Sequence, residues 1–501
     1  MGANNAIVII LPSIVVAVAA VLVFLVDLFS ARKGVVAWVA AAGLLAGAAV
    51  AVGQWATFSG GLGFNGRKPL AGFASMVGND KYAVFCVVLF AFIGIMTIML
   101  SDAYLARRKA ARGEFYGLLL LVISGMIGMV VSTDIIAFFV SFELMSLPTY
   151  VLAGYIWRDE RSGEASIKYF VTGAFSSAIL AFGLALVYGA SGQTNYASIG
   201  ASLSNLGATD AHGLVVLGFV LVVTGFGFKV SAVPFHNWAP DVYEGAPTPV
   251  TAFMSTGIKA AAFAGFAKLF IIAGGPAWQT WANAMIILAV LTMIVGNVLA
   301  LPQRNLKRML AYSSIAHAGY LTLGLIAAGK SGDRVGISAI LFYLAGYALM
   351  NLGAFGVLIW VRNRRRFAYS LDEMGGLGRT MPWAAIFMAL FMVSLAGIPP
   401  TIGFWGKFYV FTAVVQANLT WLAIVAVIMS AVSAYYYLRV VWYMYFREAP
   451  EGAEIEAEPT TSQTGVGVAV SVAAIGVLAV GLFPEPLLHA AASAVRVIVG
   501  G

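Results

Sequence analysis

Residues 225–259 read GFGFKVSAVPFHNWAPDVYEGAPTPVTAFMSTGIK, two apolar segments that each carry a lysine and are joined by a proline-rich link. The lysines are Lys229 and Lys259. Pro234 removes a backbone donor from the first segment, and two glycines loosen the turn before Lys229. We therefore expect a helix that is interrupted close to Lys229, followed by a second helix that carries Lys259.

The composition indicates that the segments carrying these lysines lie in a membrane. Of the 501 residues, 61% are hydrophobic and only 10% are charged, whereas a soluble domain carries roughly 25% charged residues. Runs of about 20 apolar residues, the length that crosses a bilayer, recur along the chain. The net charge of +8 comes from short basic clusters between these runs. This pattern predicts an integral membrane protein in a lipid bilayer and gives no indication of nucleic-acid binding.

The apolar runs predict an all-α fold of about fourteen transmembrane helices. The expected helices lie near residues 6–28, 34–57, 80–100, 115–131, 134–157, 165–190, 212–238, 246–273, 280–301, 308–328, 335–361, 382–413, 419–446 and 465–490. The first run is long enough to span and follows no basic segment, so we expect a helix of the mature protein there and no cleavable targeting peptide.

Loop charge predicts the orientation of the helices. Loops after odd-numbered helices hold most of the basic residues, and the opposite loops hold only Arg67, Lys68, Lys81, Lys330 and Arg334. By the positive-inside rule the first set is cytoplasmic, so both termini lie on the outer, periplasmic side. One cytoplasmic loop is acidic, with Glu448, Glu451, Glu454, Glu456 and Glu458.

Several ionisable residues fall inside the apolar runs, where a charge at mid-depth costs about 3 kcal/mol. They are Glu143, Lys168, Lys229, Lys259, His317 and Lys407. One carboxylate cannot neutralise three mid-helix lysines, and buried lysines without a partner give up protons readily. Such groups suit a proton relay. Lys268 and Arg439 lie nearer to helix ends, and we expect their side chains to snorkel to the interface.

A second interrupted helix is predicted by Pro399 and Pro400, which precede the sequence GFWGK at residues 403–407. Lys229 and Lys407 both follow a Gly-Phe pair, in helices 7 and 12. An offset of five helices reverses direction through the membrane, so helices 4–8 and 9–13 are expected to form two inverted repeats.

The expected parts of this single membrane domain follow from these repeats. They are three N-terminal helices in 1–113, the first repeat in 114–274, the second in 275–446, the acidic loop in 447–464 and a C-terminal helix in 465–501.

The segment from Lys229 to Lys259 resembles the signature of the antiporter-like subunits of respiratory complex I, a proton-translocating NADH:quinone oxidoreductase. Its PDVYEGAPTP portion, residues 240–249, is similar to the N type in particular. Residues 142–144, 306–317 and 403–407 also match the family, and the resemblance covers roughly 114–446.

The resemblance implies roles for the matched residues. Glu143 and Lys229 would interact, and Lys168 would modulate Lys229. Lys259 and His317 would relay the proton to Lys407, the terminal site that opens to the outside. The residues expected to support this relay are Pro234, His236, Asp241, Glu244, Pro399 and Pro400.

The resemblance also implies an assembly. NADH, FMN, iron–sulfur clusters and quinone would belong to other subunits, and this chain would bind no cofactor. The single cysteine, Cys86, and four scattered histidines agree with this expectation. The expected partners are the M-type antiporter-like subunit and small membrane subunits, in a bacterial cytoplasmic membrane.

Three other interpretations remain open. The chain could belong to a multisubunit cation/proton antiporter, or to a related membrane redox complex such as a hydrogenase. It could also be a structural scaffold in which the buried lysines carry no proton.

Overall fold

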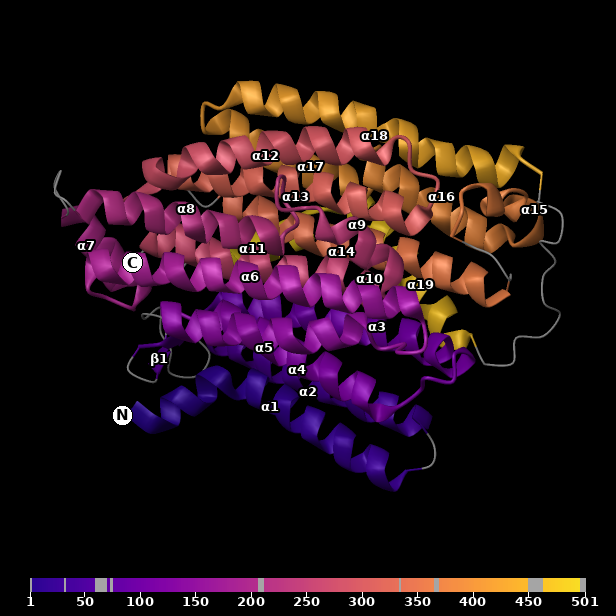
Figure 1. Ribbon diagram of the computed structural model, residues 1–501, viewed down its shortest axis with the longest axis horizontal. Coiled ribbons are helices and arrows are strands. Elements are labelled where there is room, and N and C mark those ends of the chain that lie inside the picture. The colour runs from indigo at the N-terminus through magenta and orange to yellow at the C-terminus, as the bar shows by residue number, and fades with distance from the viewer. Residues whose placement is uncertain are drawn as a thin grey trace.

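A computed structural model describes residues 2–30, 33–58, 70–72, 75–205, 211–332, 335–364, 369–448 and 463–495. Long helices lie side by side with their axes roughly parallel (Figure 1). Thirteen of the described helices are long and apolar enough to cross a membrane, and up to fourteen spans result if a bent helix pair counts as one. The prediction of an all-α membrane fold with about fourteen spans is therefore confirmed.

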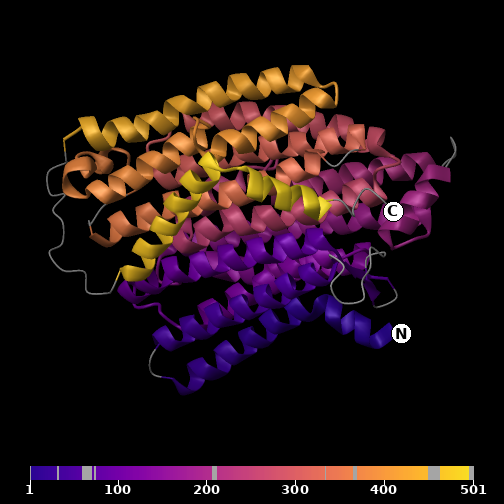
Figure 2. The same ribbon diagram turned by 180° about the vertical axis from the view of Figure 1, so that it is seen from behind.

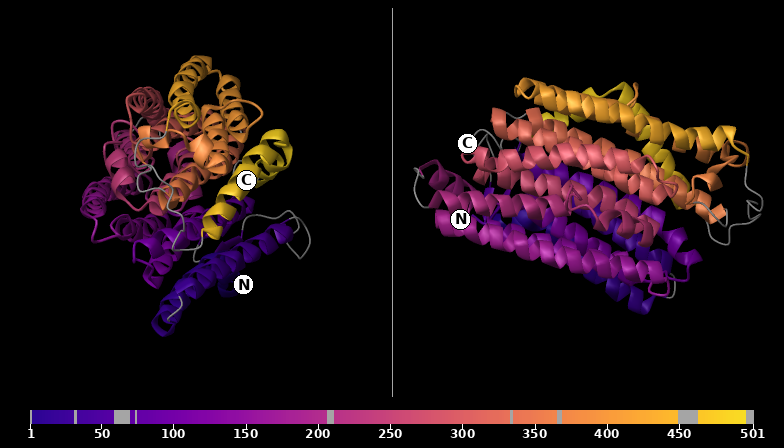
Figure 3. Two further views of the ribbon diagram at one scale, coloured as in Figure 1. Left: turned by 90° about the vertical axis from the view of Figure 1, so that its right-hand side faces the viewer. Right: turned by 45° about the horizontal axis from the view of Figure 1, so that its top comes forward.

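The N-terminal part comprises α1 (Gly2–Phe29), α2 (Lys33–Phe58) and α3 (Lys81–Arg107). Between α2 and α3, β1 (Leu70–Gly72) pairs antiparallel with β2 (Val77–Asn79), and Leu70 lies opposite Asn79. These helices form one flank of the bundle, opposite α18 (Thr420–Phe446), as the end-on view of Figure 3 shows.

Two sets of five spans follow. The first consists of α4 (Gly113–Val131), α5 (Ile135–Ala153), α6 (Glu160–Ser191), α8 (Ala211–Lys229) and a span built from α10 (Thr248–Phe253) and α11 (Lys259–Lys268) with π-helical turns at Met254–Ile258 and Leu269–Ala273. The short helices α7 (Tyr196–Asn205) and α9 (Trp238–Gly245) flank α8. Sequence patterning did not predict α7.

The second set consists of α12 (Trp278–Ala300), α13 (Leu306–Ser331), α14 (Val335–Arg364), the half-helices α16 (Pro382–Ala396) and α17 (Ile402–Gln416), and α18. A 3-10 turn (Asp372–Met374) and α15 (Leu377–Thr380) precede α16. In each set the first two spans pack together and the fourth span is the interrupted one. The exact domain boundaries stay a prediction.

The C-terminal span differs from the single helix expected over 465–490. It consists of α19 (Thr464–Leu482) and α20 (Glu485–Val495), because Pro484 cannot continue the helix. Figure 2 shows α20 ending at the same end of the bundle at which α1 begins. Most of the acidic loop, residues 449–462, lies outside the described residues.

The first interrupted helix ends at Lys229, and the link to α9 is held by other parts of the protein. The amide of Val233 donates to Thr292 Oγ1 on α12 at 2.9 Å. The Trp238 indole donates to the Phe228 carbonyl at 3.2 Å. Irregular backbone at membrane depth is tolerated where such partners replace the lost helical hydrogen bonds.

The second interruption lies between α16 and α17. Gly397 ends α16 with φ of 87°, a left-handed conformation that glycine adopts without strain. A Cβ atom at this position would lie 2.9 Å from Lys407 Cδ. Gly397 therefore both turns the chain and leaves room for the lysine. The matching GFGFK and GFWGK sequences lie on opposite sides of their breaks, before the first and after the second.

The prediction that Lys268 snorkels to the interface is wrong. Its Nζ forms an ion pair with Asp80 Oδ2 at 2.8 Å, and the two side chains are only 1% and 9% exposed. Asp80 also caps α3 by accepting from the Ala83 amide at 2.7 Å. Arg439 donates to the carbonyls of Leu301 and Gln303, just beyond the end of α12.

This buried pair ties the N-terminal helices to α11. We predict that Lys268→Met lowers the free energy of unfolding by about 3–5 kcal/mol, because it leaves the Asp80 carboxylate buried and unpaired. Thermal unfolding of the detergent-solubilised assembly measures the loss.

Adding Asp80→Asn should recover part of the stability, since asparagine keeps the helix cap without the charge. Lys330→Met is the matched control, because Lys330 donates to the Asn418 carbonyl at the surface and forms no ion pair with the described residues. Equal melting temperatures for Lys268→Met and the control would contradict the account.

Candidate functional site

Lys229 is the last residue of α8 and only 2% exposed. Its Nζ donates to Ser146 Oγ on α5 at 2.6 Å and lies 4.7 Å from the ring centroid of Phe142. The rings of Tyr150 and Tyr169 lie 5.8 Å and 5.9 Å away. A hydroxyl and aromatic faces therefore surround the ammonium group.

Glu143, the predicted partner of Lys229, makes no ion pair with it in this structure. Glu143 follows Phe142 on α5, is half-buried, and its Oε1 has no hydrogen-bond partner among the described residues. The Glu143–Lys229 interaction stays a prediction, because Lys229 is buried, Glu143 is half-buried, and no ion pair joins them in the described structure.

Lys259 opens α11, immediately after the first π-helical turn, and is 2% exposed. Its Nζ donates to Ser314 Oγ on α13 at 2.5 Å and also to the Ser314 carbonyl. The lysine of the first repeat is therefore bound by a helix of the second.

His317 lies one turn further along α13 and is hydrogen-bonded on both sides. Its Nδ1 lies 2.7 Å from the Tyr343 hydroxyl on α14, and its Nε2 lies 3.1 Å from the Tyr437 hydroxyl on α18. The Tyr437 hydroxyl is also hydrogen-bonded to Ser313, the neighbour of Ser314. Lys259 therefore binds Ser314 of α13, and His317 is connected through Tyr437 to the neighbouring residue Ser313.

Lys407 lies on α17, with 5% exposure, and its Nζ points back to the end of α16. It donates to the carbonyls of Leu395 at 3.1 Å and Ala396 at 2.8 Å, and to Ser430 Oγ on α18 at 2.8 Å. Free carbonyls at a helix C-terminus favour a cation. The ring of Tyr320 lies 5.4 Å away, and Tyr320 also meets the His317 ring edge-on at 5.9 Å.

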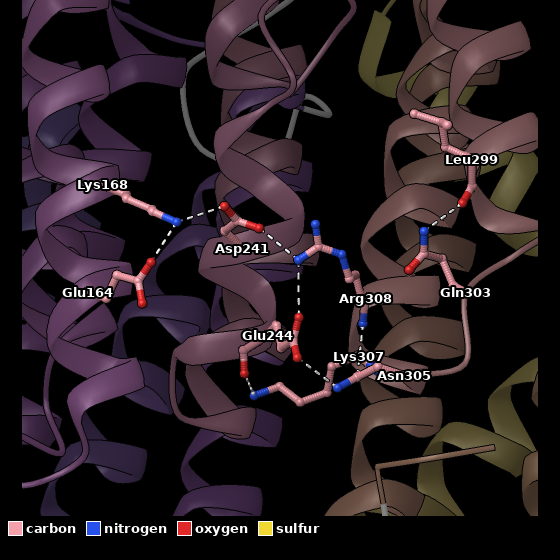
Figure 4. Close-up of polar contacts among 9 residues, drawn as sticks. All are labelled: Glu164, Lys168, Asp241, Glu244, Leu299, Gln303, Asn305, Lys307 and Arg308. Atoms are coloured by element: carbon pink, nitrogen blue, oxygen red, sulfur yellow. Dashed lines mark hydrogen bonds and ion pairs between the residues drawn. The ribbon is translucent and has the colours of Figure 1, made fainter. Parts of the chain in front are cut away.

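Lys168 lies apart from this buried axis, in a group of polar residues around α9 (Figure 4). We call this group the α9 cluster: Glu164, Lys168, Asp241, Glu244, Asn305, Lys307 and Arg308. Lys168 forms ion pairs with Glu164 at 2.7 Å and Asp241 at 2.8 Å. Its neighbour Tyr169, and not Lys168 itself, lies beside Lys229 in the described structure.

Arg308 completes the α9 cluster. It pairs with Asp241 at 2.7 Å and with Glu244 at 3.1 Å. Partial burial acts to raise the pKa of Asp241, but hydrogen bonds from Lys168 and Arg308 outweigh it and hold that pKa below its usual value. Lys307 donates to the carbonyls of Glu244 and Ala246 at the end of α9.

The remaining residues that were predicted to support the relay lie in the two links that interrupt helices. Pro234 and His236 lie in the link between α8 and α9, and His236 Nδ1 is buried without a partner among the described residues. Pro399 and Pro400 lie between α16 and α17. In the described part of the chain, no three His, Cys, Asp or Glu residues could hold a metal ion.

Sequence reasoning missed the hydroxyl groups that hold the lysines and the histidine. These are Ser146, Ser313, Ser314, Tyr343, Ser430 and Tyr437. Serine and tyrosine occur in many membrane helices, so no local signal separates these from the others. Arg308 was also missed, although it stands in the 306–317 segment that carried the resemblance.

Comparison with known proteins agrees with this arrangement. Residues 132–433 match the family model described as NADH:quinone oxidoreductase/Mrp antiporter, TM. NADH-quinone oxidoreductase subunit N of Trichlorobacter lovleyi is 42% identical, covering 98% of this chain and 97% of that protein. The subunit N of Myxococcus xanthus is 44% identical, covering 85% and 84%.

Solved structures show the same fold. A chain of respiratory complex I from Thermus thermophilus with bound aureothin is 32% identical, with a TM-score of 0.79 over 96% of this chain and all of that one. A chain of the Mrp complex from a Dietzia species has a TM-score of 0.81 over 99% of this chain and all of that one, at 21% identity, which shows a shared fold alone. By the family model and by these relatives, the chain belongs to the family of NADH-quinone oxidoreductase subunit N, the N-type antiporter-like membrane subunits of complex I.

Proposed function

We propose that this chain is a proton-translocating membrane subunit of NADH:quinone oxidoreductase and moves protons through its buried lysines and His317. The observation that carries the proposal is that Lys229, Lys259 and Lys407 are buried without an ion-pair partner among the described residues, held by hydroxyls and carbonyls instead. A lysine that is not locked to a carboxylate can take up and release a proton.

The energy needed for translocation sets how far the pKa of a relay group has to change. Moving one proton against about 150 mV costs roughly 3.5 kcal/mol, at 2.3 kcal/mol per 100 mV. That corresponds to a swing of about 2.5 units in the pKa of one group. Forming and breaking a buried ion pair such as Glu143–Lys229 changes the free energy by about 3–5 kcal/mol, which is enough.

Two hydrogen-bonded groups on α13, which meet at the neighbouring residues Ser313 and Ser314, would form the path between the lysines. A proton on Lys259 meets Ser314, and the neighbouring Ser313 is hydrogen-bonded to Tyr437, which reaches His317. Hydroxyl and imidazole groups both donate and accept, so each can pass a proton on. Lys407, near His317 through Tyr320, would be the terminal site, open to the outside.

The orientation and compartment belong to the same proposal. By the positive-inside rule, the side with the basic loops and the α9 cluster would face the cytoplasm of a bacterial cell, and both termini would lie in the periplasm. The start of α1 and the end of α20 lie at the same end of the bundle, which supports placing both termini on one side of the membrane (Figure 2). The M-type and small membrane subunits would be the neighbours in the membrane.

The redox cofactors of such an assembly do not fit this chain. Iron–sulfur clusters need several cysteine thiolates, whereas the only cysteine, Cys86, is buried within α3. NADH, FMN and quinone would likewise act in other subunits. This chain would couple to their electron transfer through its own proton path.

Replacement of Lys229 tests the function. In membrane vesicles, we expect Lys229→Ala to lower NADH-driven proton pumping roughly tenfold or more, since a loss of about 1.4 kcal/mol in the limiting step is already tenfold. Assembly of the complex is checked in parallel, and Lys330→Ala serves as the surface control. An assembled variant that pumps as the unmodified complex does would make the lysines structural.

The identity of the ion gives a second test. The buried axis presents ammonium and hydroxyl groups, whereas Na⁺ is a hard cation that needs a shell of oxygen ligands without positive neighbours. We therefore expect NADH-driven pumping to be the same in sodium-free potassium medium as in sodium medium. Pumping that requires Na⁺ would favour a cation/proton antiporter instead.

A further inference from the structure

Asp241 stands between the two repeats and divides its carboxylate between them (Figure 4). Its Oδ2 accepts from Lys168 Nζ on α6 of the first repeat at 2.8 Å. Its Oδ1 accepts from Arg308 on α13 of the second repeat at 2.7 Å. Lys168 and Arg308 therefore share a single negative charge, each through its own oxygen atom.

Each of these cations has one alternative partner. Lys168 also pairs with Glu164 at 2.7 Å, and Arg308 also pairs with Glu244 at 3.1 Å. Either cation can lose Asp241 and still keep one carboxylate. The cluster can thus rearrange without leaving an unpaired charge.

Water reaches the α9 cluster, so an exchange of partners is inexpensive. The cluster lines a cavity of about 260 Å³, and the side chains of Lys168, Asp241 and Arg308 are 42%, 35% and 32% exposed. Ion pairs at this level of exposure contribute about 1 kcal/mol or less. The buried Lys268–Asp80 pair, by contrast, is fixed.

Two aromatic residues connect the α9 cluster to the end of α8. Tyr169, next to Lys168, stacks on Trp238 at 4.5 Å between ring centroids, and its ring lies 5.9 Å from Lys229 Nζ. Trp238 opens α9, three residues before Asp241, and donates to the Phe228 carbonyl. Lys168 and Asp241 are therefore separated from Lys229 and the end of α8 by one layer of aromatic side chains, Tyr169 and Trp238.

We propose that Asp241 is a positioning residue that sets how strongly the positive charge of Lys168 acts on Lys229, according to whether Lys168 or Arg308 holds the carboxylate. This inference rests on the proposed function. When Asp241 binds Lys168, the charge of Lys168 is screened and a proton on Lys229 is favoured. When Arg308 draws Asp241 away, the less-screened Lys168 repels that proton.

The charged groups around Asp241 come from three helices. Arg161, Glu164 and Lys168 lie on α6, Glu244 lies on α9, and Lys307 and Arg308 lie on α13. Lys307 is engaged by the carbonyls of Glu244 and Ala246 and makes no ion pair with Asp241 in the described structure. Arg308 is thus the group through which the second repeat acts on Asp241.

Opposite shifts in the pH dependence of pumping test the proposal. In membrane vesicles with the intact complex, protons pumped per NADH are measured across pH. Asp241→Asn leaves Lys168 less screened, so the alkaline limb should move to lower pH, by an amount on the order of one unit or less. Arg308→Gln leaves Asp241 to Lys168, so the limb should move to higher pH.

Further variants separate this role from a structural one. Both shifts should vanish in a Lys168→Gln background, and Asp241→Glu should restore the original profile. Arg308→Lys, a milder change, should move the limb in the direction of Arg308→Gln but less. Arg304→Gln is the matched control, because Arg304 pairs with Asp372 at 3.3 Å near the same end of α13 and forms no ion pair with Asp241 or Glu244 in the described structure.

Shifts of the same sign in Asp241→Asn and Arg308→Gln, shifts that persist without Lys168, or no shift at all would each overturn the inference. If Lys229→Ala abolishes pumping while the profiles stay unmoved, only this inference fails. If Lys229→Ala pumps normally, the proposed function fails first.

Discussion

A lysine ammonium inside a membrane has to be held by oxygen atoms, and this requirement explains where the helices of this protein are irregular. Regular helices have no free carbonyls except at their ends. Lys407 binds the carbonyls released at the end of α16, and Lys307 binds those at the end of α9. Lys229 ends α8, and Lys259 follows a π-helical turn. The interruption between α16 and α17 therefore supplies oxygen atoms to Lys407, whereas Lys229 and Lys259 are held by serines of other helices.

One helix connects these sites. All residues in the apolar stretch of α13 are buried inside the protein, whereas one-third of the residues in the apolar stretches of the flanking helices α1 and α18 are buried. Along α13, Arg308 faces the α9 cluster, Ser314 binds Lys259, His317 binds two tyrosines, and Tyr320 faces Lys407. A helix of the second repeat thus contacts a lysine of the first, and the proposed path would cross between the repeats at this contact.

The sequence predicted the features that have local signals. Charges in apolar runs marked Lys229, Lys259, His317 and Lys407, and prolines marked both breaks. Their partners could not be predicted, because they lie far away along the chain: Ser146 is 83 residues from Lys229, and Tyr437 is 120 residues from His317. The environment of Lys268 was predicted wrongly for the same reason. Its partner Asp80 is 188 residues away along the chain, and only folding brings the two side chains together. The Lys229 ammonium donates to Ser146 in this structure, and the Glu143–Lys229 interaction stays a prediction.

In the proposed path, hydrogen-bonded hydroxyls of the second repeat, and not lysine charges alone, carry the proton from Lys259 towards His317. Tyr437 tests it most directly, because its hydroxyl joins Ser313 to His317 and Tyr437→Phe removes only that oxygen from a buried ring. The measurement is the number of protons pumped per NADH oxidised, with Tyr435→Phe, an exposed neighbour on the same helix, as the control. The account predicts that the ratio falls in Tyr437→Phe while the complex remains assembled, and stays constant in the control. An unchanged ratio in Tyr437→Phe would contradict it.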